Sequence, residues 1–298
     1  MSETPAAQPE SAAAKPRANM HPIVNLLVQL QELTLVRSEH EVSASGKGNP
    51  QLDQAIKDLL SQLPPEVRLL FLKSQKKDPL AIVPIANNVC SGCGLTLPVA
   101  LVYAVRSGER LYQCTNCARI LYYPDVRPRR IGGKSVRRSE PRRTGIGRFS
   151  AVSLMVPNLK AGTRDEAVRE LASLMEQEKF VDDGAKLFQE ALKREAILST
   201  AVEHGMAFPH VRGVEGGGLT LALGISRKGI RFDEDSRNLT HIIFFIVIPT
   251  AASVFYLRLL SGLNQAFSKK DAREKLMTAK TPEELWSVVT KATRTTIS

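Results

Sequence analysis

Residues 241–249 read His-Ile-Ile-Phe-Phe-Ile-Val-Ile-Pro. The apolar run 242–248 is short, is rich in β-branched and aromatic residues and ends at a proline, which is typical of a strand buried inside a sheet. Upstream, residues 219–225 alternate leucine or isoleucine with smaller or polar residues, which predicts a second strand. We therefore expect a sheet in which the segment 242–248 is a central strand.

Helical patterns surround these two strands. Thr163 to Glu166 form a capping-box pattern that opens one helix, and a second helix is expected from about Asp183. Further helices are expected at 252–267 and after Thr281, and residues 151–156 are expected to add a strand. Because helices and strands interleave, the sequence predicts a layered α/β domain over residues 149–298.

Residues 242–257 carry no formal charge and raise the question of a membrane segment. Pro249 interrupts this stretch, and it is shorter than the ~18–20 residues that a spanning helix needs. Residues 1–19 are rich in Ala, Pro and Glu and lack the features of a signal peptide, so we expect a disordered leader. We expect a cytoplasmic protein without a transmembrane segment.

The composition is that of a folded chain with an excess of basic residues. The length of 298 residues favours two compact domains, and 43% hydrophobic with 24% charged residues excludes a wholly disordered protein. The formal net charge is +11, which suggests an acidic partner such as nucleic acid if the excess is clustered.

The excess is clustered in the segment 125–148, which we expect to be a flexible linker. Between Arg127 and Arg148, nine basic residues against the single acid Glu140 give a charge of +8, since nine minus one is eight. Such a tether can attract phosphates non-specifically or can simply be solvated, and the sequence leaves both open. The basic residues are Arg127, Arg129, Arg130, Lys134, Arg137, Arg138, Arg142, Arg143 and Arg148.

The region 20–124 is expected to begin with a helical hairpin. Leu27, Leu30 and Leu33 recur at helical spacing, and a second stripe runs from Leu52 to Leu63 after a Gly- and Pro-containing break at 45–50. The expected hairpin buries one stripe against the other and has no ligand-binding or catalytic role.

Two Cys-x-x-Cys pairs follow, Cys90 with Cys93 and Cys114 with Cys117. This spacing is typical of four-cysteine structural zinc sites, in which each pair supplies one edge of a tetrahedron and the intervening chain returns as a hairpin. Four thiolates leave no open coordination position, so one Zn²⁺ would stabilise the fold and would not act as a Lewis acid. Two disulfides or a redox dithiol remain alternatives.

His210 is the candidate catalytic residue. It follows Pro209, which fixes the backbone, and Arg212 lies two residues beyond it. A neutral imidazole can attack a phosphoryl group if its other nitrogen is held by a hydrogen bond and nearby cations screen the phosphate oxygens. Arg194 and Arg212 are the candidate screens, although a lone histidine is more often structural.

The C-terminal half, from about 149 to the end, resembles the mannitol/fructose-type (type 2) enzyme IIA domain of the bacterial sugar phosphotransferase system. The resemblance rests on Arg194-Glu195, Ser199-Thr200, Gly205-Met-Ala-Phe-Pro-His210, residues 219–225 with 229–233, and residues 241–249. It implies a mixed sheet flanked by helices, with His210 as the phosphorylated histidine and Arg194 holding the phosphoryl group. It also implies a small phosphocarrier protein as donor and an enzyme IIB as acceptor.

Two positions depart from the family pattern. Glu203 stands where glycine is usual, and Tyr256 aligns near the family's second histidine. A tyrosine can donate a hydrogen bond but cannot become cationic. Thr200 and Tyr256 join Arg212 as candidate contacts of the phosphoryl group, while His204 and His241 are expected to be structural or surface residues.

The N-terminal half resembles the bacterial family in which a helical hairpin precedes a C4-type zinc ribbon. The likeness covers roughly residues 20–124 and rests on the segments 90–98 and 114–122, with Ala118 where glycine is usual. Macromolecule binding is the function that the resemblance implies.

Two functions follow from these patterns. The first is a regulatory phosphocarrier, in which His210 relays a phosphoryl group to an enzyme IIB or a regulatory target and the ribbon contacts a macromolecule. The second is a nucleic-acid-binding or scaffold protein, in which the IIA-like domain no longer transfers phosphate. Glu203, Tyr256 and the basic linker motivate the second function.

Overall fold

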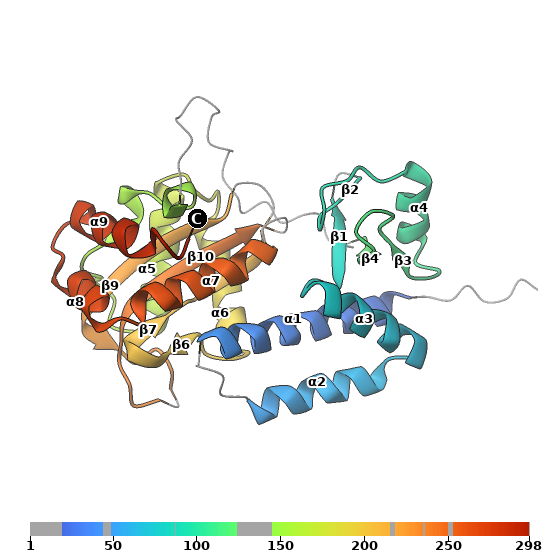
Figure 1. Ribbon diagram of the computed structural model, residues 1–298, viewed down its shortest axis with the longest axis horizontal. Coiled ribbons are helices and arrows are strands. Elements are labelled where there is room, and N and C mark those ends of the chain that lie inside the picture. The colour runs from blue at the N-terminus through green and yellow to red at the C-terminus, as the bar shows by residue number, and fades with distance from the viewer. Residues whose placement is uncertain are drawn as a thin grey trace, which may run out of the picture.

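A computed structural model of the protein describes residues 20–43, 49–86, 88–123, 145–214, 218–234, 236–249 and 253–297. Its C-terminal part is a sheet with helices on both sides, and its N-terminal part combines helices with a small separate sheet (Figure 1). The expected leader 1–19 and most of the expected linker lie outside the described residues.

The C-terminal sheet is mixed, and β10 (Thr240–Pro249) is its central strand, as predicted. β10 pairs antiparallel with β9 (Thr220–Ile230) and parallel with β7 (Met206–Ala207) and β8 (His210–Val214). β5 (Met155–Val156) and β6 (Ala201–Val202) complete the order β5-β9-β10-β7-β6, with β8 paired to β10. The apolar run of β10 is buried throughout because helices cover both faces of the sheet.

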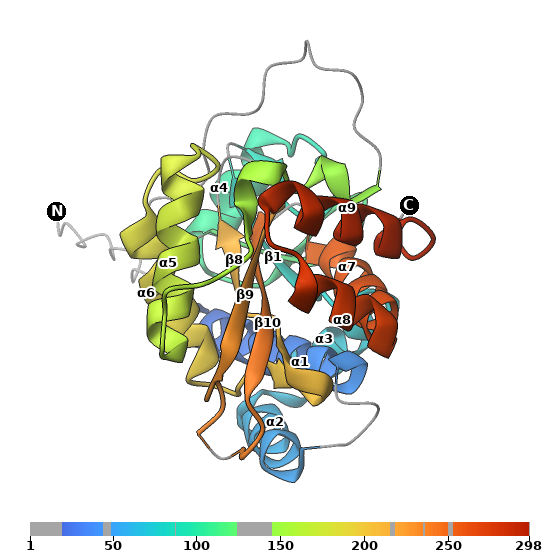
Figure 2. The ribbon, with the colours of Figure 1, turned by 90° about the vertical axis from the view of Figure 1, so that its left-hand side faces the viewer.

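Helices α5 (Arg164–Gln177) and α6 (Gly184–Glu195) cover one face of this sheet. Helices α7 (Ser253–Phe267), α8 (Lys270–Thr278) and α9 (Pro282–Thr293) cover the other, as Figure 2 shows. The capping box at α5 forms as predicted, Thr281 caps α9 as predicted, and Asp183, near which the second helix was expected to begin, caps α6. Helix α8 was not predicted.

The expected strand at 151–156 is only partly present. A short 3₁₀ helix, η2 (Val152–Leu154), occupies its first half, and only Met155 and Val156 pair with β9. The amide of Leu154 donates to the carbonyl of Ala151, and the Leu154 side chain is fully buried. Local hydrogen bonding and burial of this leucine therefore override the extended pattern. Another 3₁₀ turn, η1 (Gly145–Arg148), precedes this segment.

The N-terminal helices are α1 (His21–Ser43), α2 (Pro50–Gln62) and α3 (Pro65–Lys77). The predicted stripes of α1 and α2 meet in one apolar cluster, which also contains Phe71 of α3. Helix α3 was not predicted from the sequence, in which Pro64 and Pro65 directly follow the second apolar stripe. Pro65 stands at the first position of the helix, where no amide hydrogen is needed.

The cysteine pairs lie in a small sheet with the order β2-β1-β4-β3. Its strands are β1 (Ile82–Ala86), β2 (Val89–Cys90), β3 (Tyr112–Gln113) and β4 (Ile120–Tyr122). A helix, α4 (Val99–Ser107), lies between the pairs, where a simple hairpin was expected. Of the helices in the described ranges, none is long and apolar enough to cross a lipid bilayer.

Helix α1 is in contact with both halves of the protein. Near its middle, the Gln31 side chain donates to the carbonyl of Ile82 and accepts from its amide, each at 2.8 Å. Near its C-terminal end, the side chain of Asn264 in α7 donates to the carbonyl of Val42 at 3.0 Å. The expected packing of α1 against α2 is present, and α1 packs in addition against the ribbon and the C-terminal domain.

Candidate functional site

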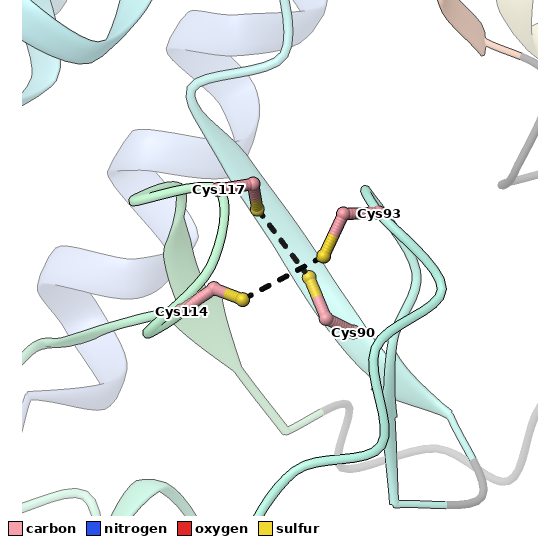
Figure 3. Close-up of side chains that lie close together, drawn as sticks. All are labelled: Cys90, Cys93, Cys114 and Cys117. Carbon is pink, nitrogen blue, oxygen red and sulfur yellow. Dashed lines mark hydrogen bonds between the residues drawn. The ribbon is translucent and has the colours of Figure 1, made fainter.

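The four cysteines converge on one point (Figure 3). Their sulfur atoms all lie within 4.8 Å of one another, and the Sγ–Sγ distance is 3.7 Å both for Cys90 with Cys117 and for Cys93 with Cys114. A tetrahedral ion bound by thiolates at ~2.3 Å has sulfur–sulfur edges of about 3.8 Å. A disulfide would need a distance of ~2.0 Å, and all four cysteines are free. The disulfide alternative is therefore wrong for this structure.

The surroundings of the sulfurs also fit a metal ion. Burial raises the pKa of the Cys90 and Cys114 thiols, so a bound cation is needed to hold both as thiolates at neutral pH. Both knuckles end in the left-handed backbone region, with φ of +76° at Gly94 and +58° at Ala118. Ala118 tolerates this conformation at some cost, because an L side chain crowds the neighbouring carbonyl there. The four residues can hold one metal ion.

His210 lies at the first position of β8, and its side chain is 1% exposed. The carbonyl of Pro209 accepts from the amide of Ile246 in β10, and the ring of Phe208 stacks on Phe244 at 5.3 Å. The central strand therefore fixes the backbone that carries the imidazole. Arg194 reaches the same point from the last turn of α6.

The hydrogen bonds of the imidazole define its reactive nitrogen. Nδ1 lies 3.0 Å from the carbonyl of Phe208, which can only accept, and Nε2 accepts from Nε of Arg194 at 3.1 Å. The proton is therefore on Nδ1, and the lone pair is on Nε2. Burial lowers the pKa of His210 to about 3, and the positive charge of Arg194 adds to this effect. The imidazole is consequently neutral at pH 7 and able to act as a nucleophile through Nε2.

Arg212 and Tyr256 meet beside the imidazole, as the sequence predicted. His210 and Arg212 are two residues apart on β8, so their side chains share one face of the strand. The Arg212 guanidinium lies over the Tyr256 ring, 5.0 Å from its centroid, and the Tyr256 hydroxyl is 3.1 Å from Nδ1. Burial lowers the pKa of Arg212 to about 10, so it keeps its charge at neutral pH. Its Nη1 atom has no hydrogen-bond partner within the described residues.

Thr200 lines the same pocket, but its hydroxyl donates to Glu195 at 2.8 Å. Glu195 also accepts from the Thr200 amide and from the Ser199 hydroxyl, so this buried carboxylate closes the turn after α6. Of the two residues of this motif, Arg194 therefore contacts the imidazole and Glu195 stabilises the turn after α6. Glu203 is exposed and does not line the pocket, so this departure from the family pattern places no negative charge beside the imidazole.

A different carboxylate, that of Glu39 in α1, faces His210, and no sequence pattern predicted it. Its Oε2 accepts from Nη2 of Arg194 at 2.7 Å, and its Oε1 lies 3.2 Å from Nε2 of His210 and contacts Nη2 of Arg212. Glu39 is 5% exposed. It belongs to a helix whose apolar stripe predicted a role within a hairpin only, and it is 155 residues from Arg194 in sequence.

The predicted linker residues fall almost entirely outside the part of the chain that the structure describes. Arg129, Arg130, Arg137, Arg138, Arg142 and Arg143 all fall outside the described residues. Of the linker's basic residues only Arg148 is described, and it stacks over the ring of Phe149. His204 is exposed, and Nδ1 of His241 is bonded to the carbonyl of Ser226, in agreement with the structural or surface roles expected.

The comparisons with known proteins cover the same two parts of the chain. Residues 149–292 match the family described as the phosphoenolpyruvate-dependent sugar phosphotransferase system, EIIA 2, and residues 89–121 match the C4-type zinc ribbon domain. A fructose-specific EIIA component of Haloferax volcanii is 27% identical over 146 residues, which are 49% of this chain and 95% of that protein. A nitrogen regulatory protein of Pseudomonas aeruginosa is 26% identical over 134 residues, 44% of this chain and 86% of that protein.

Among solved structures, the nitrogen regulatory protein IIA-Ntr of Neisseria meningitidis is 30% identical. The comparison covers 48% of this chain and 98% of that one, with a TM-score of 0.45. The family matches agree with the mixed sheet around β10 and with the four converging sulfurs. The protein therefore carries a phosphotransferase-system EIIA type 2 domain at residues 149–292 and a C4-type zinc ribbon at residues 89–121.

Proposed function

We propose that this protein is a regulatory phosphocarrier of the phosphotransferase system, in which Nε2 of His210 accepts a phosphoryl group from a small phosphocarrier protein. The observation that supports this role best is the state of the imidazole. Nδ1 is bonded to the carbonyl of Phe208, Nε2 carries the lone pair, and the pKa of about 3 keeps the ring neutral.

In the transfer step, the Nε2 lone pair forms a bond to phosphorus while the bond from phosphorus to the donor breaks. The electron pair of the broken bond stays on the donor, and the Nδ1 proton of His210 stays on its ring. Arg194 and Arg212 then neutralise the phosphoryl oxygens, and the unpartnered Nη1 of Arg212 is available to donate to one of them. Onward transfer to an enzyme IIB or a regulatory target reverses the same step.

Tyr256 stabilises the acceptor without adding charge. Its hydroxyl lies beside Nδ1, and burial raises its pKa to about 12, so it remains a neutral phenol. The Cys90, Cys93, Cys114 and Cys117 cluster would hold one structural Zn²⁺, which stabilises the ribbon. A regulatory role agrees with the likeness to a nitrogen regulatory protein, and the ribbon would supply the contact with a macromolecule. We place the protein in the cytoplasm, where such carriers meet their donors.

The test is phosphoryl transfer from a labelled, phosphorylated small phosphocarrier protein to the full chain. The wild type should gain an acid-labile label, and His210→Ala should gain none. His204→Asn is the matched control, because His204 is exposed with φ +68° and asparagine tolerates that conformation. Equal labelling of wild type and His210→Ala, or no label on either, would refute the proposal.

The alternative, a nucleic-acid-binding or scaffold protein, predicts a different result. It requires absent phosphorylation together with salt-dependent binding to nucleic acid that is lost when residues 127–148 are removed. The described residues supply no observation that favours it.

A further inference from the structure

Helix α1 inserts a carboxylate into the pocket of His210, and this contact has consequences for the proposed function. The Glu39 carboxylate binds the two cations that a phosphoryl group would need, Arg194 at 2.7 Å and Arg212 in direct contact. Its Oε1 also lies 3.2 Å from Nε2 of His210. A carboxylate and a phosphoryl group are both anions, and a guanidinium group can bind two oxygens of either one at the same time. Glu39 therefore occupies the position of the incoming phosphoryl oxygens.

The space left around the imidazole is too small for both groups. The cavity bounded by Glu39, Arg194, Thr200, His210 and Tyr256 has a volume of about 30 Å³. This is room for about two water molecules. A phosphoryl group brings four heavy atoms and must approach Nε2 to ~3–3.5 Å before a bond can form. The side chains of His210 and Glu39 are 1% and 5% exposed, so a donor protein cannot reach Nε2 while Glu39 remains in place.

The segment around Glu39 is held against the domain by further contacts. Val36, one turn before Glu39, belongs to the apolar cluster against which Leu198 packs. Val42, one turn after it, packs against the core of the C-terminal domain, and its carbonyl accepts from Asn264. These contacts, together with the two ion pairs, hold the carboxylate in the pocket.

We propose that α1 is an intramolecular inhibitor of the phosphoacceptor site: Glu39 blocks His210 until the C-terminal end of α1 moves away, and phosphorylation of His210 keeps it away. This inference rests on the proposed function. A phosphoryl group on Nε2 takes over Arg194 and Arg212 and repels the carboxylate that they had bound. The coupling is reciprocal. If phosphorylation of His210 increases the affinity of a partner that holds α1 away, that partner must favour phosphorylation at equilibrium by the same factor.

Helix α1 also connects the pocket to the ribbon. Gln31, two turns before Glu39 and thus about 12 Å along the helix, makes two hydrogen bonds to Ile82 of β1. Leu35, between them, is buried in the apolar cluster of the ribbon. Displacement of α1 from His210 must therefore move the ribbon relative to the C-terminal domain. The phosphorylation state of His210 would in this way change the surface that the ribbon offers to its partner.

The experiment compares initial rates of labelling by phosphorylated phosphocarrier protein in full-length variants. Glu39→Gln keeps the shape of the side chain but removes its charge, and we expect labelling at least 10-fold faster than in wild type. The matched control is Glu41→Gln on the same helix, because Glu41 is exposed and pairs only loosely with Arg37 at 3.8 Å. It should label at the wild-type rate.

A second variant keeps the test decisive if Glu39→Gln does not fold. Asn264→Ala removes the hydrogen bond to Val42 without touching the pocket and should accelerate labelling several-fold. Equal rates in wild type, Glu39→Gln and Asn264→Ala would overturn the inhibitory role and leave the proposed function intact. Absence of label in every variant would overturn both.

Hydrogen exchange measures the release of α1 directly. Amides at 36–43 should exchange faster once His210 is phosphorylated, whereas those of β10 should not change. Unchanged exchange at 36–43 in the fully phosphorylated protein would contradict the displacement of α1.

Discussion

The ribbon and the pocket of His210 differ in how far apart their parts lie along the chain. Two pairs of cysteines build the ribbon centre, and Cys90 and Cys117 are only 27 residues apart. The pocket joins Glu39 to Arg194 across 155 residues. In the ribbon, short-range spacing brings the sulfurs together and determines their chemistry. In the pocket, the reactive group is encoded locally, but access to it depends on a distant helix.

This difference predicts that the two sites can be lost separately, and the largest effect is expected in the ribbon. Cys114→Ser should abolish binding of one Zn²⁺ per chain and unfold the ribbon, because structural zinc contributes on the order of 10 kcal/mol to such small folds. The C-terminal domain has its own apolar core and should keep its β-sheet signal. Metal analysis and thermal denaturation followed by circular dichroism measure both effects.

The control for this variant is Ser91→Ala, which lies within the first cysteine pair and should leave the zinc content unchanged. Full zinc binding by Cys114→Ser would show that the sulfur of Cys114 is not a ligand. Loss of the β-sheet signal of the C-terminal domain together with the ribbon would show that the two parts do not fold independently.

The second prediction concerns the guanidinium beside the imidazole. Arg194→Gln should lower the rate of His210 phosphorylation about 100-fold, since removal of one positioned donor from a developing anion typically has this effect. Arg194 also donates to the carbonyl of Leu198, so the turn after α6 should loosen. Labelling by the phosphorylated carrier is the measurement.

The neighbouring Lys193 supplies the control. It is exposed and pairs with Glu190 on the same helix, so Lys193→Gln should label at the wild-type rate. If the labelling rate fell equally in the two variants, the cause would be the positive charge removed from α6 and not the contact of Arg194 with Nε2.

The smallest effect is the pH dependence of stability that His210 contributes. Its pKa is about 3 in the folded protein, against 6.5 in the unfolded chain, so below pH 6.5 the unfolded chain binds the additional proton. Stability is therefore lost as the pH falls from 6.5 towards 3, and about 2 kcal/mol of unfolding free energy should disappear between pH 7 and pH 5. Denaturant titrations of the C-terminal transition at both pH values measure this change.

His210→Gln should lose less stability than wild type over the same interval, because glutamine does not titrate. His204→Asn provides the comparison, since His204 is exposed and its replacement should leave the wild-type loss intact. Identical losses in wild type and His210→Gln would mean that the imidazole is protonated in the folded protein.

Much of the fold was predictable because its signals are local. The apolar run of β10, the alternation in β9 and the three side-chain caps of α5, α6 and α9 each depend on a few neighbouring residues. Predictions were wrong where a local sequence pattern is compatible with two secondary structures. Two adjacent prolines usually interrupt a helical pattern, yet Pro65 begins α3, and the residues 151–156 predict a strand, yet Leu154 turns into the core.

The sequence by itself pointed to the four cysteines of the ribbon, to His210 as the candidate nucleophile and to the arginine beside it, because cysteine spacing and the segment before His210 are signals carried by short stretches. Only the tertiary structure decided which carboxylate meets the imidazole. It excluded Glu203, which is exposed, and brought in Glu39 from a helix whose apolar stripe gave no sign of it. The physical reason is that this buried ion pair depends on how two helices distant in sequence pack together. The apolar periodicity of each helix shows which face is buried, but it does not show which residues of the other helix lie opposite.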